Sequence, residues 1–312
     1  MKNERKEKYV HEVFESIAGK YDFMNLLMTW GMLPHWQKLV MEKTELGPGG
    51  KGLDVCCGTG EMTYQQAEIA GRYGQAVGLD FSAQMLEAAR AKMKDHPNCH
   101  VQFVEGDALA LPFPDDSFDA ATSGFALRNV SDIPLAIREM ARVVRAGGKV
   151  VCIDVSRPGF PPARAFFNFY YFKVVPWLGS HLVSGKTISN GFPAYTWLAE
   201  SLKTFPPRNE IAQMFRDAGL AAVEVHPVGF GAATIYSGVK TSADYDFAAE
   251  SAAVRCKRLE RGAVRARGAV AKLTQAALRL KKIERLRTFL NDFRNVWQTF
   301  SCMIGADTRA RS

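Results

Sequence analysis

A glycine turn behind a short buried run is the part of this sequence best suited to hold a small ligand. The run Gly52 to Val55 has the length of a buried strand, and Gly58-Thr59-Gly60 follows it. Glycine lets the backbone turn sharply and lets a ligand approach closely. The helix expected from Glu61 adds unpaired N–H groups and the positive end of its dipole. The turn is therefore predicted to bind an anion or a nucleotide, unless it is a plain strand-to-helix connection.

An acid lies where a nucleotide site would need one. The next apolar run, Ala76 to Asp80, ends in an aspartate roughly 20 residues beyond the turn, the distance at which a carboxylate binds ribose hydroxyls in nucleotide-binding sheets. The simpler alternative is that Asp80 caps a helix that begins after Ser82. The dinucleotide pattern G-x-G-x-x-G lacks its third glycine, because Glu61-Met62-Thr63 follows the turn, and this argues against NAD or FAD.

These residues must be positioned by a sheet. After Gly50, strands and helices alternate in the manner of a parallel α/β sheet. Two closing strands joined by a short link form a hairpin, so the last strand is expected to run antiparallel. The predicted strands are 52–55, 76–80, 101–105, 118–123, 149–155, 222–226 and 232–238. Two helices are predicted to start at residues 61 and 82, and two more to cover 133–144 and 208–218.

Two further segments flank this pattern. Residues 9–46 are helical in periodicity and rich in aromatic residues and methionine, which fits either a core-packing helix pair or a lid over the glycine turn. Residues 157–206 interrupt the alternation with an insertion full of aromatic side chains. This insertion is expected to add helices over the edge of the sheet.

The excess positive charge lies in the C-terminal extension. The chain of 312 residues has a formal net charge of +8, and residues 241–312 contain 15 Lys/Arg against 7 Asp/Glu. The first 240 residues therefore carry 25 of each sign, which argues against nucleic-acid binding by this body. The extension reads as basic amphipathic helix, with Leu273, Ala276 and Leu280 on one face. It is predicted to lie on an anionic membrane, or else to pack on the body or a second copy.

The bulk of the sequence fits a cytoplasmic protein. No apolar stretch is long enough to span a bilayer, and the charged N-terminus has no secretory pattern. The six cysteines have no zinc-type spacing, and Cys56-Cys57 are adjacent, so we expect reduced thiols and no bound metal.

Several longer motifs make the sequence similar to one family. The pattern from Asp54 to Gly60 resembles the first motif of class I S-adenosylmethionine-dependent methyltransferases, with Cys56 at the usual first glycine. Over about residues 10 to 240 the chain resembles the C-methyltransferases of ubiquinone and menaquinone biosynthesis. The motifs that carry the resemblance are Lys20-Tyr21-Asp22-x-Met24-Asn25, Leu111-Pro112-Phe113, Phe125-Ala126-Leu127-Arg128-Asn129-Val130, Gly147-Gly148 and Tyr195-x-x-Leu198-Ala199-Glu200-Ser201.

The resemblance implies a fold and a reaction. The fold is a Rossmann-like class I methyltransferase sheet in residues 1–240, with an N-terminal helical lid and a helical extension from 241. The methyl group of S-adenosylmethionine passes to a ring carbon of a reduced prenylated quinone, and no metal is needed. The Cys56-Cys57-Gly58-Thr59 variant is closer to the demethylmenaquinone branch than to the ubiquinone branch. The resemblance also allows a homodimer.

The resemblance assigns roles to individual residues. The cofactor-binding set is Asp54, Gly58, Thr59, Gly60, Asp80, Asp107, Ala108 and Gly124, with Asp80 on the ribose hydroxyls and Asp107 and Ala108 beside the adenine. Gly124 stands where the family often has serine. Arg128 and Asn129 are expected to face the quinol, and Tyr21 and Asn25 to close the site. Arg128 would stabilise a phenolate, although a structural ion pair is the alternative; His35 and Asp154 are rival proton acceptors.

Other functions fit the same motifs less well. The alternatives are the benzoquinol C-methyltransferase of the ubiquinone pathway, another class I small-molecule methyltransferase, and a non-catalytic scaffold of a quinone-synthesis complex. An NAD-dependent oxidoreductase is disfavoured by the missing glycine and by the lack of a hydride-transfer constellation.

Overall fold

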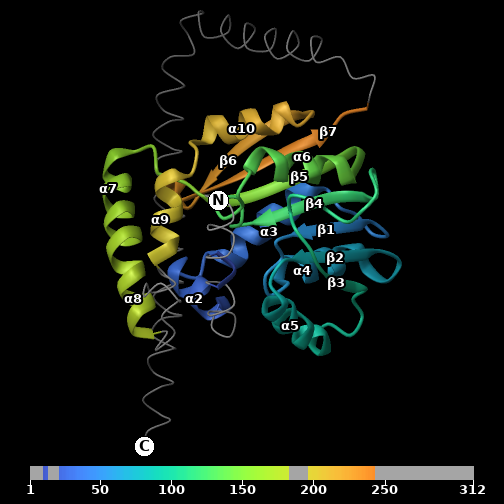
Figure 1. Cartoon of the computed structure of the whole chain (residues 1–312), viewed down its shortest axis with the longest axis horizontal. Coiled ribbons are helices and arrows are strands. Elements are labelled where there is room, and N and C mark those ends of the chain that lie inside the picture. The colour runs from blue at the N-terminus through green and yellow to red at the C-terminus, as the bar shows by residue number, and fades with distance from the viewer. Residues whose placement is uncertain (1–9, 13–20, 183–195, 243–312) are drawn as a thin grey trace, which may run out of the picture. The chain divides into compact units, whose positions relative to one another are not determined.

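The computed structural model describes residues 10–12, 21–182 and 196–242. The chain divides into two compact units, residues 1–244 and 245–312, and the described residues all lie in the first (Figure 1). The basic extension expected from residue 241 therefore lies outside the described residues, except for its first two positions.

A seven-stranded sheet in the order β3-β2-β1-β4-β5-β7-β6 forms the centre of the described body. Strands β1 to β5 pair with one another in parallel. Strand β7 lies between β5 and β6 and is antiparallel to both. The expected antiparallel last strand is therefore confirmed. The strands are β1 (Lys51–Val55), β2 (Gln75–Asp80), β3 (Val101–Glu105), β4 (Phe118–Gly124), β5 (Val144–Val155), β6 (Leu220–Val228) and β7 (Ala233–Lys240).

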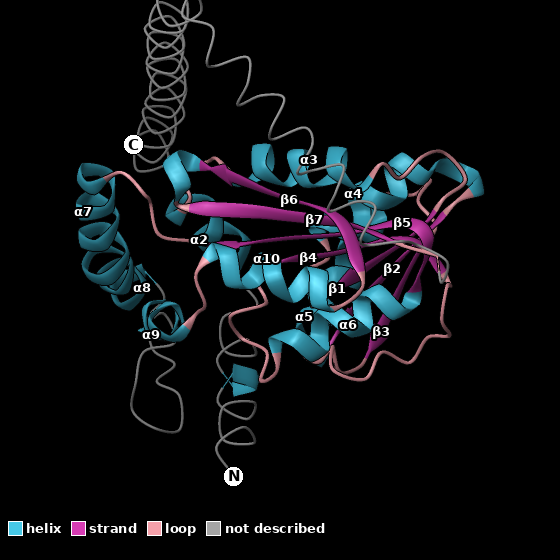
Figure 2. Cartoon of the chain, turned by 90° about the horizontal axis from the view of Figure 1, so that it is seen from above, coloured by secondary structure: helices cyan, strands magenta, loops and turns pink. Residues whose placement is uncertain are grey.

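Helices cover both faces of this sheet (Figure 2). Alternate residues of β5 show the two layers: Val150 and Cys152 belong to the core cluster of α6 and α10, whereas Val151 and Ile153 pack with α3 and α4. This alternation follows from the two-residue repeat of a strand buried on both faces. The helices of the sheet layers are α3 (Leu33–Thr44), α4 (Glu61–Ala70), α5 (Ala83–Ala91), α6 (Ile133–Val143) and α10 (Arg208–Asp217).

Four more helical segments lie beyond one end of the strands, side by side in both views (Figures 1 and 2). They are α2 (Tyr21–Met28), α7 (Pro161–Phe169), α8 (Val175–Leu182) and α9 (Thr196–Thr204), and the π-helical turn Tyr170–Val174 joins α7 to α8. The hydroxyl of Tyr170 donates to the carbonyl of Met28 at 3.2 Å, which ties the insertion to the N-terminal segment. Among the described residues, no helix has the length and hydropathy needed to cross a bilayer.

The predicted elements agree with the structure except around Gly147. The sequence places a helix over 133–144 and a strand from 149, but β5 begins at Val144, directly after α6. Val144 pairs with Phe118, and the register then shifts, so that Lys149 pairs with Ala120. Gly147 has a φ of +79°, which glycine adopts without strain, and the glycines expected to close the helix lie within this irregular strand.

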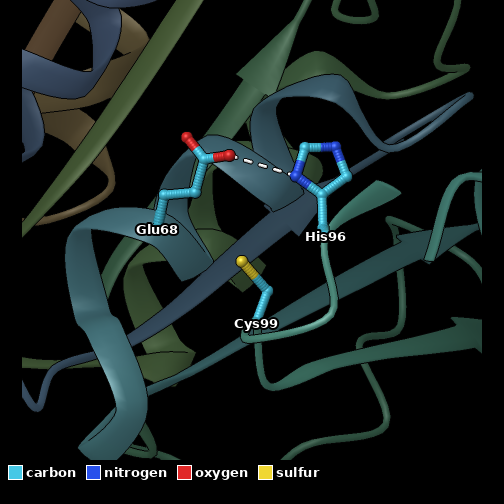
Figure 3. Close-up of side chains that lie close together, drawn as sticks. All are labelled: Glu68, His96 and Cys99. Carbon is cyan, nitrogen blue, oxygen red and sulfur yellow. Dashed lines mark hydrogen bonds and ion pairs between the residues drawn. The ribbon is translucent and has the colours of Figure 1, made fainter. Parts of the chain in front are cut away.

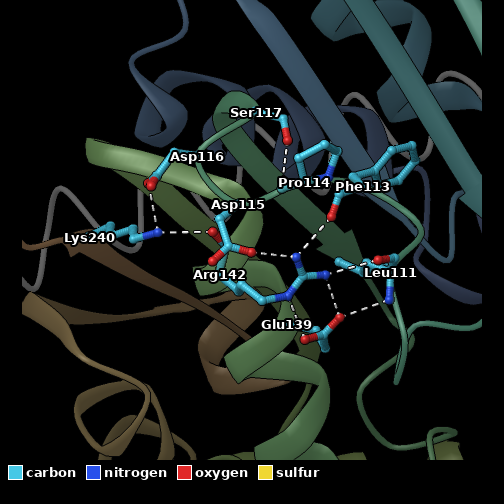
Figure 4. Close-up of polar contacts among 9 residues, drawn as sticks. All are labelled: Leu111, Phe113, Pro114, Asp115, Asp116, Ser117, Glu139, Arg142 and Lys240. Atoms are coloured by element: carbon cyan, nitrogen blue, oxygen red, sulfur yellow. Dashed lines mark hydrogen bonds and ion pairs between the residues drawn. The ribbon is translucent and has the colours of Figure 1, made fainter.

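Arg142 on α6 fixes the loop between β3 and β4 (Figure 4). Its guanidinium donates to the carbonyls of Leu111 and Phe113 and forms ion pairs with Asp115 and Glu139, all at 2.8–2.9 Å. Glu139 in turn accepts a hydrogen bond from the backbone N–H of Leu111. Three loop residues and Glu139 of the same helix thus bind one guanidinium, which holds the loop that follows residues 106–109 in one conformation.

Candidate functional site

A cavity of about 280 Å³ opens at the carboxyl ends of the parallel strands β1, β2 and β4. Ligands of doubly wound α/β folds bind at this end of the sheet, where the direction of strand succession reverses. In this sheet the reversal falls between β1 and β4. The lining residues are Val10, Cys56, Gly58, Asp80, Phe81, Met85, Gly106, Asp107, Ala108, Leu109, Gly124, Phe125, Ala126, Asn129, Val130 and Ser131.

The glycine turn brings bare backbone to this cavity. Cys56 has a φ of +57° and Gly58 a φ of +55°, both in the left-handed region that glycine favours. A glycine-like conformation at Cys56 explains why glycine is usual at this place in the first methyltransferase motif. Burial raises the pKa of the Cys56 thiol well above its usual range, so the side chain that lines the cavity is an uncharged thiol.

Asp80 joins the glycine turn to the next helix and also lines the cavity. One carboxylate oxygen accepts from the N–H of Gly58 at 2.8 Å, and the other accepts from the N–H of Ser82 at 3.0 Å. The cap of α5 is Ser82 and not Asp80, so Asp80 supports the capping residue rather than the first turn of the helix. Each carboxylate oxygen has two lone pairs, which leaves Asp80 able to accept further hydrogen bonds from a ligand. Burial raises the pKa of Asp80, and the backbone N–H donors oppose that shift.

The other wall comes from the loop after β3 and from helix α5. Asp107 and Ala108 line the cavity, and Asp107 keeps one oxygen on the N–H of Leu109 at 2.9 Å. Met85 of α5 adds apolar surface; the hydroxyl of Ser82, which caps this helix as expected, accepts from its N–H. Gly124 lines the cavity at the end of β4, where a Cβ would stand 2.8 Å from the terminal carbon of Met62.

Three residues of the predicted cofactor-binding set do not line the cavity. Asp54 is fully buried beneath the turn, where it accepts hydrogen bonds from Thr63 and Thr122 at 2.9 and 2.8 Å. The hydroxyl of Thr59 donates to Asp22 of α2 at 2.6 Å. Gly60 lies close to Phe103 and Ala89, which leave no room for a Cβ. Asp54 supports the turn from beneath, whereas Thr59 and Gly60 belong to the turn but are buried against α2, α5 and β3.

The motif 125–130 divides between the cavity and the core. Asn129 lines the cavity; its Nδ2 donates to the carbonyl of Phe125 at 3.2 Å, and its Oδ1 accepts from Trp197 Nε1 of α9 at 2.9 Å. Arg128 does not line it. The guanidinium of Arg128 and its backbone N–H both bind the carboxylate of Asp154, in an ion pair almost completely removed from solvent.

The rival proton acceptors also lie away from the cavity lining. Asp154 is fully buried on β5 and is held by Arg128, and His35 is an exposed residue of α3. The structural ion pair considered for Arg128 is therefore present. A direct contact of Arg128 or Asp154 with the quinol stays a prediction.

Residues of the N-terminal segment lie beside the cavity. Val10 is buried and lines the cavity, and His11 packs edge-on against Phe81 with ring centroids 5.2 Å apart. Tyr21 begins α2, but its side chain lies outside the described residues, and Asn25 does not line the cavity. Asp22 of this segment contacts the glycine turn through Thr59 and also pairs with Lys92 at 2.7 Å.

Sequence reasoning missed several of these contacts for a clear reason. Phe81 directly follows Asp80, the residue expected to bind the ribose, so its position beside the cavity is a local signal that was available. The bonds from Thr59 to Asp22 and from Trp197 to Asn129 join residues 37 and 68 positions apart, and no local pattern predicts such pairs.

A second polar cluster lies outside the cavity lining (Figure 3). Glu68, His96 and Cys99 bring three potential metal-ligand atoms within 4.8 Å of one another. His96 Nδ1 lies 3.0 Å from Glu68 Oε1, and the ring stacks on Tyr64, so this hydrogen-bond contact and the stacking account for the arrangement. Cysteine spacing alone does not predict this cluster, because the pattern His96-x-x-Cys99 contains a single cysteine and Glu68 lies far away in the sequence.

The cavity fits S-adenosylmethionine by the chemistry of its lining. The carboxylates of Asp80 and Asp107 are acceptors for ribose hydroxyls and for an adenine amino group, which are all donors. Phe81, Met85 and Leu109 provide apolar walls for a planar base. The left-handed backbone at Cys56 and Gly58 leaves the turn open to close approach.

Comparisons with known proteins agree on one family. Residues 2–240 match the model of the ubiE/COQ5 methyltransferase family. The demethylmenaquinone methyltransferase of Alkalihalophilus pseudofirmus is 42% identical over 235 residues, which are 75% of this chain and 97% of that protein. The protein of the same name from Halalkalibacterium halodurans is 41% identical over 77% of this chain and 96% of its own length.

Solved structures support the fold. A possible histamine N-methyltransferase of Thermotoga maritima, described as S-adenosylmethionine-dependent, is 20% identical, with a TM-score of 0.51 over 74% of this chain and all of its own. The putative methyltransferase solved with the Trm112 activator of Haloferax volcanii has a TM-score of 0.52 at 20% identity, over 73% of this chain and 98% of its own. The class I methyltransferase fold is thus confirmed, and S-adenosylmethionine is the methyl donor. The chain belongs to the ubiE/COQ5 methyltransferase family.

Proposed function

We propose that this enzyme methylates the ring of demethylmenaquinol to give menaquinol. The observation that carries the proposal is the identity of 41–42% to proteins named demethylmenaquinone methyltransferase, over 96–98% of their own lengths. The motif variant Cys56-Cys57-Gly58-Thr59, which favours that branch on sequence grounds, points the same way.

The cavity residues have separate tasks in this reaction. Asp80 and Asp107 hold the ribose and the adenine, and the glycine turn approaches the amino-acid part of the donor. S-adenosylmethionine supplies an electrophilic methyl group on a sulfonium. Asn129, Ser131 and Phe125 line the same cavity from the loop after β4 and bound the place for the acceptor. Holding donor and acceptor in line at near-attack distance supplies a large part of the rate.

The acceptor has to be reduced for chemical reasons. A quinol carries phenolic hydroxyls, and loss of a proton from one of them makes the ring carbon nucleophilic, whereas the oxidised quinone has no such proton. A free phenol has a pKa of about 10, so deprotonation at neutral pH needs a base or a nearby positive charge. The loop that bears Asn129 also carries the cation Arg128, whose guanidinium carbon lies 5.9 Å from the ring centroid of Phe125.

A prenylated acceptor also determines where in the cell the enzyme acts. Because the prenyl chain stays in the bilayer, we propose a cytoplasmic enzyme that works at the inner face of the membrane, with the basic extension 241–312 contributing to the attachment and a homodimer as the working form. The family model matches residues 2–240, and an alignment of 235 residues covers 97% of one curated relative, which supports a body that folds without the extension. Removal of residues 245–312 should then weaken binding to anionic vesicles while methyl transfer to a soluble short-chain quinol persists.

The experiment that tests the proposed function compares acceptors. The purified enzyme is given S-adenosylmethionine with demethylmenaquinol, with the same compound left oxidised, or with a prenylated benzoquinol, and methylated products are quantified. The proposal requires product from the reduced naphthoquinol and none from its oxidised form. Faster turnover of the benzoquinol would assign the enzyme to the ubiquinone branch, and binding of the donor without any product would favour the scaffold role.

A further inference from the structure

A continuous aromatic surface faces solvent where α2 meets α7. Phe166 and Phe169 of α7 are 60% and 63% exposed, and Leu26 and Trp30 are exposed beside them. Trp30 contacts Phe166 and Tyr170 edge-on, with centroids 6.4 and 5.6 Å apart, so the two segments form one surface. We call Leu26, Trp30, Phe160, Phe166 and Phe169 the aromatic face.

A cationic hollow borders this face. The space, of about 710 Å³, is lined by Arg157, Arg164, Asn168, Phe169, Phe172 and Lys173. Backbone carbonyls hold both arginines in place: Arg157 donates to Leu202, and Arg164 donates to Pro158 and Gly159. None of the ion pairs found within residues 10–12, 21–182 and 196–242 involves these three cations.

We propose that the aromatic face and the cationic hollow together bind the headgroup layer of an anionic lipid bilayer. Aromatic side chains favour the membrane interface, and contiguous exposed apolar surface of this kind marks an interaction site. Three cations that form no ion pair among the described residues, placed around a hollow with phenylalanine in its wall, complement lipid phosphates. This surface belongs to the body of the enzyme and is distinct from the basic extension.

The position of the surface gives it a use in catalysis. Helix α2 carries the exposed Leu26 on one side, while its Asp22 binds Thr59 of the glycine turn. Trp197 of α9, which lies beside α8, binds Asn129 in the cavity lining. Helix α2 thus joins the aromatic face to the glycine turn, and α9, whose Leu202 carbonyl holds Arg157 of the hollow, joins the hollow to the cavity lining. This arrangement would give a membrane-held acceptor a short path to the site. The choice of a bilayer over a soluble anion rests in part on the proposed prenylated substrate.

The test measures vesicle binding by the full chain, without quinol or S-adenosylmethionine, so that it is independent of turnover. Vesicles contain phosphatidylglycerol and phosphatidylcholine in equal parts, or phosphatidylcholine alone. The Phe166→Ser/Phe169→Ser variant should bind both kinds about tenfold or more weakly, because two large apolar side chains are lost. Lys173→Gln removes a cation that makes no described hydrogen bond, and it should weaken binding to the anionic vesicles alone, by about fivefold.

The matched control changes an aromatic and a cation elsewhere on the surface. Tyr73 is 78% exposed and lies under the guanidinium of Arg72 at 4.4 Å, so Arg72→Gln/Tyr73→Ser removes similar groups away from the proposed face. This control should bind vesicles as the unaltered chain does. Thermal melting of each variant verifies folding.

Two results would overturn the proposal. One is vesicle binding by the folded Phe166→Ser/Phe169→Ser and Lys173→Gln variants that equals binding by the unaltered chain. The other is a loss of dimer mass by light scattering in the phenylalanine variant with vesicle binding intact, which would make the aromatic face an interface between two copies.

Discussion

The amide of Asn129 is held from both sides, because its oxygen accepts a 2.9 Å hydrogen bond from the indole N–H of Trp197 while its nitrogen donates to the carbonyl of Phe125. This relationship joins the cavity lining to helix α9, which lies in the aromatic insertion. It also fixes which end of the amide faces Trp197, since an indole N–H can only donate. The insertion is therefore part of the site and not merely an addition to the fold.

We predict that Trp197→Phe lowers methyl transfer with little effect on donor binding. Phenylalanine keeps most of the apolar contact but has no N–H, so the Asn129 amide loses one of its two fixed contacts. A lost hydrogen bond of about 0.5–1.5 kcal/mol corresponds to a fall in kcat/KM for the quinol of about threefold to tenfold. Calorimetric titration with S-adenosylmethionine provides the comparison. An equal loss of donor affinity would show that Trp197 acts on the cofactor side of the cavity.

Asp80→Ala should weaken S-adenosylmethionine binding strongly. The carboxylate lines the cavity and also holds the N–H groups of Gly58 and Ser82. Hydrogen bonds to a charged group contribute about 1.5–3 kcal/mol, so the dissociation constant is expected to rise about tenfold to a hundredfold. Asp116→Asn, at an exposed carboxylate that pairs with Lys240, is the matched control. Unchanged donor affinity in Asp80→Ala would remove this residue from the cofactor site.

The buried pair of Arg128 and Asp154 allows stability to be separated from catalysis. Arg128→Met alone leaves the Asp154 carboxylate without its partner and should cost about 3–5 kcal/mol of unfolding free energy. The double change Arg128→Met/Asp154→Leu removes both charges and should recover most of that loss.

We expect turnover by the double variant to stay low even though it folds, because the guanidinium of Arg128 on the loop after β4 is gone. Donor titration, denaturant unfolding and methyl transfer are measured on the same samples. Near-normal turnover in the double variant would leave the pair a purely structural role.

Asp54 should make the enzyme less stable as the pH rises. Burial raises the pKa of this carboxyl to about 7, while hydrogen bonds from Thr122 and Thr63 partly oppose the shift. The folded protein therefore keeps a proton that the unfolded chain releases near its ordinary pKa of about 4. Between these two pKa values the folded state binds more protons, so its stability falls with pH, and the loss is complete above the folded pKa.

The variant Asp54→Asn has no such proton to lose. From pH 5 to pH 7 the unaltered chain should lose about 2–3 kcal/mol more unfolding free energy than Asp54→Asn. Urea unfolding at a series of pH values measures the difference, and subtraction removes the contributions of Asp80 and other groups common to both. Parallel pH curves for the two proteins would mean that Asp54 ionises normally inside the fold.

Local patterns in the sequence predicted the sheet and the part of the site that lies next to it. Asp80, Asp107 and Gly124 each follow or end a strand, and parallel strands bring their carboxyl ends together, so their convergence was predictable. Even the unusual Cys56 carries a signal, since it stands where glycine is expected and has a left-handed φ.

The remaining features depend on how distant segments meet. Arg128 and Asn129 are neighbours in sequence and share a motif, yet one faces the core and the other the cavity, because Phe125 has a left-handed backbone and the chain turns beyond it. The contact of Asp22 with Thr59 likewise requires the N-terminal helix to fold back over the turn. Burial and long-range hydrogen bonds decide such matters, and a single sequence displays neither.

The most direct test of the account follows the methyl group itself. The enzyme is given S-adenosylmethionine with a deuterated methyl group together with reduced demethylmenaquinone, and the product is fragmented in a mass spectrometer. We predict that the label is found on a ring carbon of the naphthoquinone head group, and only when the acceptor is reduced. A label on a ring oxygen, or bound donor with no labelled product, would contradict the assignment of this site to C-methylation of a quinol.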